Sequence, residues 1–459
     1  MTNPSASSGD NSAARGSSAY RAAMDFIFQR LNYERVSHDS YNVEDFRLAR
    51  MARLLELLDN PHERLPVVHV AGTKGKGSTS AMLASMLQAA GIRTGLFTSP
   101  HIVRFEERMT VNGVEPQESE IVSLVDRVKS AVEQLVIEMP PGPTYFELTT
   151  ALAWLHFLDQ NCEFAVLEVG LGGRLDSTNL CRPHCCIITS ISRDHMRLLG
   201  DTLPQIAAEK AGIIKPGVPV VTGIEQPEVL AVIEEFAARA EAPLYRLGHE
   251  IHYQSSEVSD TTDLPRHRVT VETPRQRYAD LICPLPGRHQ CRNLALAVTA
   301  FDLVCTGTEL PAVRQGLAAV DWPLRIQQVG TRPRVIIDTA HNDASMTALC
   351  ETLAPLKHRR RVLIFATSRD KDAAAILRIL DSAFDEAILT RYVHNPRALP
   401  IDQLSTIAES ALTIPWQAVA DPAAAWTIAR QRVSEDDLLC VTGSVFLAAE
   451  MQIILGGSV

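Results

Sequence analysis

The fold is decided by the stretch Val67-Val-His-Val-Ala-Gly-Thr-Lys-Gly-Lys-Gly-Ser-Thr-Ser80. Apolar residues typical of a strand run into Gly72, Gly75 and Gly77, and hydroxyl side chains then open a helical segment rich in Ala, Leu and Met. A glycine-rich turn between a buried strand and a helix directs backbone N–H groups, and the positive end of the helix dipole, at one point. The stretch therefore predicts a loop that binds phosphate.

Two side chains of this loop match the chemistry of a nucleotide. Lys76 carries a charge that can reach the outer phosphates, and Ser78 has the hydroxyl that such loops offer to phosphate or Mg²⁺. The spacing Gly72-x-x-Gly75-Lys76-Gly77-Ser78 is shorter than the usual Walker A form, so we interpret it as a variant nucleotide loop. An ordinary turn between strand and helix is the alternative, but a lysine and a serine together at the helix start favour nucleotide binding.

Composition narrows the class of protein. A chain of 459 residues is too long for one average core and suits two or three domains. Its 44 basic and 54 acidic residues give a net charge of −10, and no long basic run compensates, which argues against a general nucleic-acid binder. The nine cysteines include no C-x-x-C pair, so we expect reduced, mostly buried thiols in an intracellular protein.

The first residues of the chain and its hydropathy bear on where in the cell the protein is located. Residues 1–18 are rich in Ser, Ala, Gly and Asn and lack the apolar segment of a signal peptide, which predicts a disordered tail. No apolar stretch reaches the ~20 residues that span a bilayer. We therefore expect a soluble, cytoplasmic protein with no membrane partner.

Polar residues follow further predicted strands at their carboxyl ends, where open α/β sheets bind ligands. A short strand ends in Thr98 and Ser99, which are placed near the phosphates unless they only form a turn. Residues 164–170 predict a buried parallel strand that carries one carboxylate, Glu168. Since Mg²⁺ prefers one or two carboxylates with phosphate and water, Glu168 is a candidate magnesium ligand. A salt bridge to Arg174 is the other interpretation, and the two are compatible.

Two nearby segments add candidate residues. The glycine-rich loop 170–179 offers Arg174 and Asp176 to a polar substrate, although such a loop alone is a weak signal. The next strand ends at Asp194 and His195, which should lie beside the metal.

The remainder of the chain predicts a small β-excursion and a second α/β domain. The excursion lies between about residues 227 and 285, before a helix near Arg292. Strands and helices then alternate, which indicates a mainly parallel sheet. The predicted elements are strand 334–337, helix 344–356, strand 361–366, helix 373–384, strand 386–389, a further helix and strand 438–442. A proline coincides with the change of pattern at Asp321-Trp-Pro323, the natural domain boundary.

Taken in chain order, the motifs resemble those of the folylpolyglutamate synthase / dihydrofolate synthase family, within the Mur ligase superfamily. The matching segments extend from about residue 20 to the end and are Gly72–Ser78, Thr98–His101, Leu167–Asn179, Asp194-His195, Ala208–Lys215, Gly287–Asn293, Arg325, Asp338–Asn342 and Asp370–Asp372. The resemblance implies a P-loop-containing parallel-sheet N-terminal domain (19–322) and a smaller Rossmann-like α/β C-terminal domain (323–459). The active site would lie in the interdomain cleft.

The resemblance also implies an activity. L-glutamate would be ligated to a folate or to dihydropteroate at the expense of ATP, through an acyl phosphate, by a monomeric enzyme. This agrees with the predicted phosphate loop, because phosphoryl transfer needs a cradle and metal ions more than covalent protein chemistry.

The resemblance also assigns roles to individual residues. The nucleotide would be bound by Gly72, Thr73, Gly75, Lys76, Gly77, Ser78, Asn293, Arg325 and Asp338. The substrates would be bound by Gly173, Arg174, Asp176 and His341. Two Mg²⁺ sites would be formed by Ser99, Glu168 and His195. Lys76, His195 and Lys210 would be catalytic, and Lys210 would be carbamylated, which turns a cation into an anionic ligand.

Three positions depart from the family pattern. Leu324 and Thr339 stand where the family generally has Gly, and Arg193 stands where it has Leu. Glycine in the turn at 339 would allow a positive φ, and an added cation at 193 could repel Mg²⁺ or help to bind an anionic substrate. Two alternatives therefore stay open: a related ligase with another acceptor, and a non-catalytic nucleotide- or folate-binding relative. Retention of Lys76 and Lys210 weighs against the second alternative.

Overall fold

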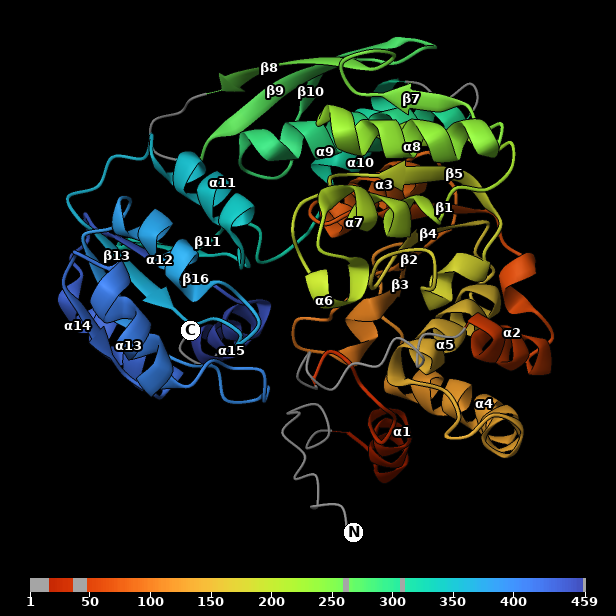
Figure 1. Ribbon diagram of the computed structural model, residues 1–459, viewed down its shortest axis with the longest axis horizontal. Coiled ribbons are helices and arrows are strands. Elements are labelled where there is room, and N and C mark those ends of the chain that lie inside the picture. Colours follow the sequence, from red (N-terminus) through yellow and green to blue (C-terminus); the bar gives the residue numbers. More distant parts are fainter. Residues whose placement is uncertain (1–15, 36–47, 259–263, 306–309, 457–459) are drawn as a thin grey trace.

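The computed structural model describes residues 16–35, 48–258, 264–305 and 310–456. Within these residues the chain forms two α/β units that lie next to each other (Figure 1). The predicted N-terminal tail falls outside the described residues up to residue 15, and its last residue, Ser18, already begins helix α1 (Ser18–Phe28). The side chain of Ser17 caps this helix by accepting a hydrogen bond from the backbone N–H of Tyr20.

The first unit is built on a sheet with the strand order β3-β2-β4-β1-β5-β6-β7. Its strands are β1 (Val67–Ala71), β2 (Thr94–Phe97), β3 (Met109–Val111), β4 (Phe164–Glu168), β5 (Pro183–Ile188), β6 (Val220–Thr222) and β7 (Leu244–Arg246). All neighbouring strands run parallel except β2 and β3. Strands β1 and β4 are buried along their whole length, as expected from their continuous apolar runs. The predicted parallel-sheet domain is therefore confirmed.

Helices cover both faces of this sheet. Val68 and Val70 point into a core formed with α3 (Lys76–Ala89), α9 (Arg288–Val304) and α10 (Leu310–Ala318). Val67 points to the opposite face, which packs against α1, α2 (Leu48–Leu57), α4 (Glu118–Glu138) and α5 (Tyr145–Asp159). Ala71 lies on that same opposite face, in a core with α7 (Leu203–Ala211) and α8 (Pro227–Arg239). Because both faces are covered, the ligand-binding edge of the sheet is where the strands end.

The predicted β-excursion is a three-stranded antiparallel sheet. It consists of β8 (His252–Val258), β9 (Arg266–Glu272) and β10 (Arg277–Ile282), and its inner face packs on α9 and α10. The prediction of β-structure from about residue 227 was wrong for α8. The first residue of that helix, Pro227, has a fixed φ and lacks an N–H, both of which suit the first helical position.

The second unit is a mixed sheet with the strand order β11-β12-β16-β13-β14-β15, in which β11 runs antiparallel to β12. Its strands are β11 (Gln327–Thr331), β12 (Arg334–Ile337), β13 (Arg361–Phe365), β14 (Glu386–Leu389), β15 (Trp416–Ala418) and β16 (Leu438–Thr442). One face packs against α11 (Asp343–Leu353), α12 (Ala373–Asp381) and α13 (Ile401–Ala411). The other face packs against α14 (Pro422–Arg432) and α15 (Val445–Gly456). The predicted alternation of strands and helices is confirmed.

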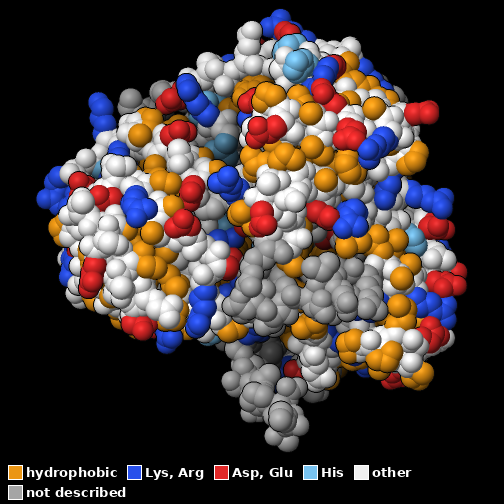
Figure 2. Space-filling model, viewed as in Figure 1, with side chains coloured by type: hydrophobic (Ala, Val, Ile, Leu, Met, Phe, Trp, Pro, Cys, Tyr) orange, Lys and Arg blue, Asp and Glu red, His pale blue; other side chains and the backbone are white. Residues whose placement is uncertain are grey.

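A cavity of about 650 Å³ lies between the two units and is lined by residues of both. The chain passes from one unit to the other between α10 and β11, and the predicted linker, residues 321–323, lies in that connection. On the face drawn in Figure 2, acidic and basic side chains are interspersed rather than gathered by sign. None of the helices in the described part of the chain is long and apolar enough to cross a membrane.

Candidate active site

The glycine-rich loop forms one wall of the cavity, between the end of β1 and the start of α3. Helix α3 begins at Lys76, with Gly75 as its N-cap in a left-handed conformation, φ 87°. A side chain at Gly75 would overlap the amide of Asn293, and one at Gly72 would overlap the hydroxyl of Thr189. Glycine is therefore required at both positions, because α9 and the end of β5 pack directly against the loop.

Lys76, Glu168 and Ser99 lie together where β1, β4 and β2 end. Nζ of Lys76 is 3.7 Å from Oε1 of Glu168, and the backbone N–H of Ser99 donates to Oε2 of Glu168 at 3.4 Å. Burial raises the pKa of Glu168, and the charge of Lys76 opposes this. The alternative salt bridge between Glu168 and Arg174 is wrong, because Arg174 pairs with Glu209 at 2.8 Å.

Lys210 lies on the same side of the cavity as the glycine-rich loop. Its side chain is buried, and Nζ donates a hydrogen bond to the carbonyl of Gly72 at 3.0 Å. Burial, reinforced by the nearby charge of Lys76, lowers the pKa of Lys210 to about 7. A substantial share of this lysine is therefore a neutral amine near neutral pH.

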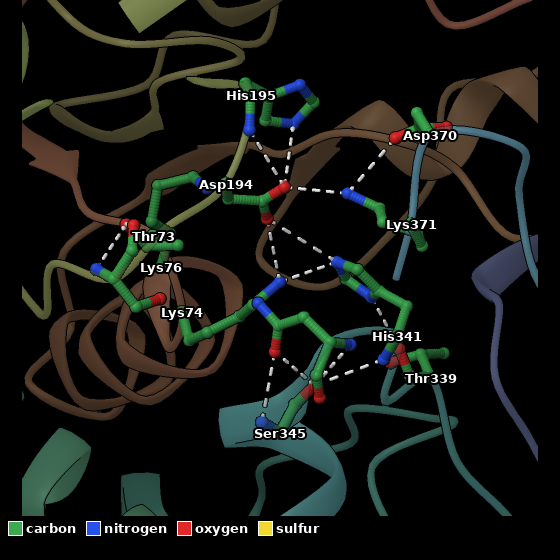
Figure 3. A network of polar contacts seen from close by, with 12 residues as sticks. Thr73, Lys74, Lys76, Asp194, His195, Thr339, His341, Ser345, Asp370 and Lys371 are labelled. Carbon is green, nitrogen blue, oxygen red and sulfur yellow. Dashed lines mark hydrogen bonds and ion pairs between the residues drawn. The ribbon is translucent and has the colours of Figure 1, made fainter. Parts of the chain in front are cut away.

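Asp194 is the centre of a polar network that joins the two units (Figure 3). Its Oδ2 lies 3.1 Å from Nζ of Lys74, and its Oδ1 lies 2.7 Å from Nζ of Lys371. Nε2 of His195 is 3.8 Å from Oδ1 of the same carboxylate. Burial alone would raise the pKa of Asp194, but the positive charges of Lys74 and Lys371 help to hold it well below its usual range. An ionised carboxylate thus links the glycine-rich loop to the second unit.

The ring of His341 is oriented by both of its nitrogens. Nδ1 lies 2.8 Å from the carbonyl of Thr339, which accepts only, so Nδ1 carries the hydrogen. Nε2 is then an acceptor, and it lies 2.6 Å from Nζ of Lys74, which donates. Burial and the charge of Lys74 lower the pKa of His341 to about 4, so the ring is neutral at neutral pH.

The remaining predicted nucleotide residues line the same cavity from α9 and the second unit. Nδ2 of Asn293 donates to Oε1 of Gln290 at 2.9 Å, which fixes the amide against the glycine-rich loop. Asp338 accepts hydrogen bonds from the backbone N–H groups of Ile326 at 2.9 Å and Ala340 at 2.6 Å. Arg325 also faces the cavity, and its guanidinium donates to the hydroxyl of Thr339.

The four predicted substrate residues divide into two groups. Asp176 and His341 line the cavity, whereas Gly173 and Arg174 do not. Gly173 packs against the backbone of α7, and Arg174 is half exposed in its pair with Glu209. Asp176 accepts the backbone N–H groups of Leu171 and Thr178, at 2.9 and 3.0 Å, so its carboxylate also organises the loop that carries it.

Sequence reasoning gave no role to several residues that line the cavity. Lys74 and Lys371 stand within the quoted motifs, but only the fold shows that they share Asp194. Arg50 and Glu147, which also line the cavity, form a buried ion pair of 2.8 Å. The signal available for Glu147 was the Thr-x-x-Glu spacing of a capping box, which predicts a helix start rather than a binding site.

The three departures from the family pattern differ in their consequences. Leu324 has a left-handed backbone with φ 58°, which an L-residue rarely adopts, and its side chain is fully buried. Thr339 does not have a positive φ, so glycine is not needed there. The side chain of Arg193 is exposed and does not line the cavity.

Comparisons with known proteins agree with this arrangement. Two family models match the chain: the Mur ligase middle domain over residues 70–301, and the Mur ligase glutamate ligase domain over residues 324–445. The dihydrofolate synthase/folylpolyglutamate synthase of Bacillus subtilis is 35% identical over 412 residues, which cover 88% of this chain and 94% of that protein. The folylpolyglutamate synthase of Lacticaseibacillus casei is 35% identical over 414 residues, 89% of this chain and 94% of that protein.

The fold is also that of a solved structure. Folylpolyglutamate synthase of Mycobacterium tuberculosis, complexed with ADP and AMPPCP, aligns with a TM-score of 0.87 and 29% sequence identity. The alignment covers 95% of this chain and 98% of that one. The chain therefore belongs to the folylpolyglutamate synthase and dihydrofolate synthase family of Mur ligases.

Proposed function

We propose that this protein catalyses the ATP-dependent ligation of L-glutamate to a folate-type carboxylate, on tetrahydrofolate, dihydropteroate or both. The observation that carries the proposal is a cavity in which the loop with Lys76 and the carboxylate of Glu168 face Arg325 and Asp338 of the second unit. The names of the relatives, and the ADP and AMPPCP complexes of the Mycobacterium tuberculosis enzyme, support the same activity.

The reaction consists of two displacements. A carboxylate oxygen of the acceptor attacks the γ-phosphorus of ATP, the bond to the bridging oxygen breaks, and ADP leaves. The neutral amine of glutamate then attacks the acyl carbon, the C–O bond to phosphate breaks, and the amine loses a proton. The N–H groups of the loop and the charge of Lys76 offset the negative charge of the transferring phosphoryl group. A cavity between two domains limits the access of water to the acyl phosphate.

The residues of the cavity fit Mg²⁺. Ser99, Glu168 and His195 all line it. The carboxylate of Glu168 is contacted by the backbone N–H of Ser99 at 3.4 Å and by Nζ of Lys76 at 3.7 Å, and both distances are long enough to leave acceptor capacity for a metal. No group of three His, Cys, Asp or Glu side chains among the described residues could hold a metal alone. Mg²⁺ does not need such a cage, because phosphate and water complete its shell. We propose that these three residues hold Mg²⁺, which when bound neutralises phosphate charge.

We also propose that Lys210 is carbamylated. Its neutral amine can form an N–C bond with CO₂ and release a proton, which is favoured by a pKa of about 7. The carbamate would replace a buried cation beside Lys76 with an anion, and so remove a repulsion between like charges. Asp176 and His341, which line the cavity, are proposed as contacts for the two substrates.

Phosphate release and product mass test the function. The protein is incubated with ATP, Mg²⁺ and L-glutamate, and tetrahydrofolate and dihydropteroate are added in separate reactions. We expect phosphate release that depends on the acceptor, and a product heavier by one glutamyl unit. Nucleotide binding without any product would instead favour a ligase with another acceptor or a non-catalytic relative. We further propose a cytoplasmic monomer, which light scattering after gel filtration and cell fractionation would test.

A further inference from the structure

The turn that carries Arg325 is built in an unusual way. Leu324 and Ile326, the residues on either side of Arg325, both have left-handed backbones, with φ of 58° and 50°. Residues with a branched side chain rarely adopt this conformation, and it persists only where the surrounding structure enforces it. The surrounding structure must therefore hold these two residues in the left-handed conformation.

Two opposite cores hold the two flanking residues. The side chain of Leu324 is fully buried in the core between the second sheet and helices α14 and α15. Ile326 is 3% exposed and belongs to the core on the other face of that sheet, under α11, α12 and α13. The backbone N–H of Ile326 also donates to Oδ2 of Asp338 at 2.9 Å. With the side chains of both neighbours anchored in cores, the turn presents the charged side chain of Arg325 to the cavity, which Ile326 also borders.

The guanidinium of Arg325 is held by neutral acceptors. Nη1 donates to the carbonyl of Leu324 at 3.2 Å and to the hydroxyl of Thr339. Among the described residues, Nε and Nη2 of Arg325 have no hydrogen-bond acceptor, and no carboxylate forms an ion pair with the guanidinium. Both oxygens of the nearby Asp338 already accept backbone N–H groups. The positive charge of Arg325 and the edge of its guanidinium formed by Nε and Nη2 thus remain available to an anion in the cavity.

Thr339 lies between two groups that line the cavity. Its hydroxyl accepts the hydrogen bond from Arg325, and its carbonyl accepts the one from Nδ1 of His341. Thr339 as a whole is 9% exposed and itself lines the cavity, so most of the residue is removed from bulk water. A hydroxyl at this place fixes the direction of the guanidinium without neutralising it.

We propose that Thr339 is a positioning residue, whose hydroxyl aims the guanidinium of Arg325 at the phosphates of the bound nucleotide. This inference rests on the proposed function, since it assumes that the cavity binds ATP. It assigns to Thr339 a role in nucleotide affinity, with no contact between Thr339 and the reacting atoms.

The test compares variants of the full chain by calorimetric titration with ADP and by steady-state kinetics. Thr339→Val removes the hydroxyl and keeps the branched shape, whereas Thr339→Ser keeps the hydroxyl. Loss of one hydrogen bond to a charged group predicts ADP binding about tenfold weaker in Thr339→Val, with KM for ATP raised to a similar extent and kcat changed less than about threefold. Thr339→Ser should remain within about twofold of the unaltered protein.

A double-mutant cycle with Arg325→Ala separates positioning from a general effect on structure. In the Arg325→Ala background, Thr339→Val should cause no further loss of ADP affinity, because the group that it positions is absent. Thr339→Ala serves as the second variant if Thr339→Val does not fold.

Three outcomes would overturn the proposal. Unchanged ADP affinity in a folded Thr339→Val or Thr339→Ala protein contradicts it, and so does an equal loss in the presence and absence of Arg325. Failure of the unaltered protein to bind ADP would overturn both this inference and the proposed function. If the unaltered protein binds ADP but forms no glutamyl product, only the proposed ligation fails, and the ADP titrations still decide the role of Thr339.

Discussion

Two turns face the same cavity from opposite sides, and both need a left-handed backbone. The glycine-rich loop has Gly75, with φ 87°, at a place where a side chain would overlap Asn293. The turn around Arg325 has Leu324 and Ile326, whose buried side chains lie in two cores. The first turn requires that a side chain be absent, and the second requires that side chains be present. A left-handed turn can thus be specified locally by glycine or at a distance by packing.

The largest effect is expected at the glycine-rich loop, from Lys76→Ala. The side chain of Lys76 is 17% exposed and contributes no apolar core, so the fold should survive its loss. Ligation should fall about 10³-fold, because the phosphates lose a preorganised charge and Glu168 loses the cation 3.7 Å away. Product mass and a thermal melt are measured together. Ligation near the unaltered rate in a folded variant would refute the role of Lys76.

Gly75→Ala should have the next largest effect. Together with a control at another left-handed glycine, it separates the effect of overlap with Asn293 from the effect of backbone strain. A methyl group at Gly75 meets the side chain of Asn293 in a left-handed conformation, so we expect ADP binding to weaken about 100-fold and stability to fall by about 1–3 kcal/mol. Gly91→Ala is the matched control, because Gly91 has a similar φ of 84° and nothing within 4 Å of an added Cβ. Gly91→Ala should lose stability only.

If Gly75→Ala and Gly91→Ala leave the same ADP affinity, the overlap with Asn293 does not matter and the loop is less tightly packed than the distances indicate. Titration with ADP and denaturation by urea measure the two quantities separately.

The contrast between the two turns also explains what the sequence could reveal. The phosphate loop and strand β4 were predictable because glycines, a lysine and apolar runs stand close together in the chain. Four strands of the second unit, β12, β13, β14 and β16, were predictable from their apolar runs, whereas β11 and β15 were missed. Helix α8 was missed because its polar surroundings suggested short strands, although Pro227 marks a helix start.

The rest of the site depends on residues far apart in the chain. Nζ of Lys74 meets His341, 267 positions later, and Asp194 meets Lys371, 177 positions later. No local pattern encodes such meetings. The sequence also does not show which side chains of a loop point into a site. Arg174 stands two residues before Asp176, yet it does not line the cavity and pairs with Glu209 instead. The left-handed turn at Arg325 has no glycine to announce it.

Lys210 offers a smaller effect with a defined pH dependence. Burial lowers its pKa from 10.5 to about 7, so between these two pH values the unfolded chain binds more protons than the folded one. The contribution of Lys210 to the free energy of unfolding therefore rises with pH through that window. Below about pH 7 the destabilisation caused by its buried charge reaches its full size. In buffers free of CO₂, Lys210→Met should raise the melting temperature by several degrees at pH 6.5, relative to its effect at pH 10.

A pH-independent difference between Lys210→Met and the unaltered protein would contradict the lowered pKa of Lys210. Addition of bicarbonate supplies the matching control for the carbamate. It should stabilise the unaltered protein near neutral pH and leave Lys210→Met unchanged.

The smallest effect is expected at Leu324, where it measures the strain in the second turn. Burial of a leucine contributes about 1.5–3 kcal/mol, which offsets the roughly 1–2 kcal/mol cost of a left-handed residue. Leu324→Ala loses the burial and keeps the strain, whereas Leu324→Gly loses the burial and relieves the strain. We therefore expect Leu324→Gly to be more stable than Leu324→Ala by about 1 kcal/mol, measured by urea denaturation.

Leu363 supplies the matched control for this comparison, because it is also fully buried but lies in strand β13 without a positive φ. Glycine in a strand interior is less stable than alanine, so the order of the two variants at Leu363 should be the reverse of that at Leu324. The same order at both positions would mean that Leu324 carries no strain. In that case the packing of the side chain of Leu324 would determine the stability of the turn, and its left-handed backbone would cost no measurable free energy.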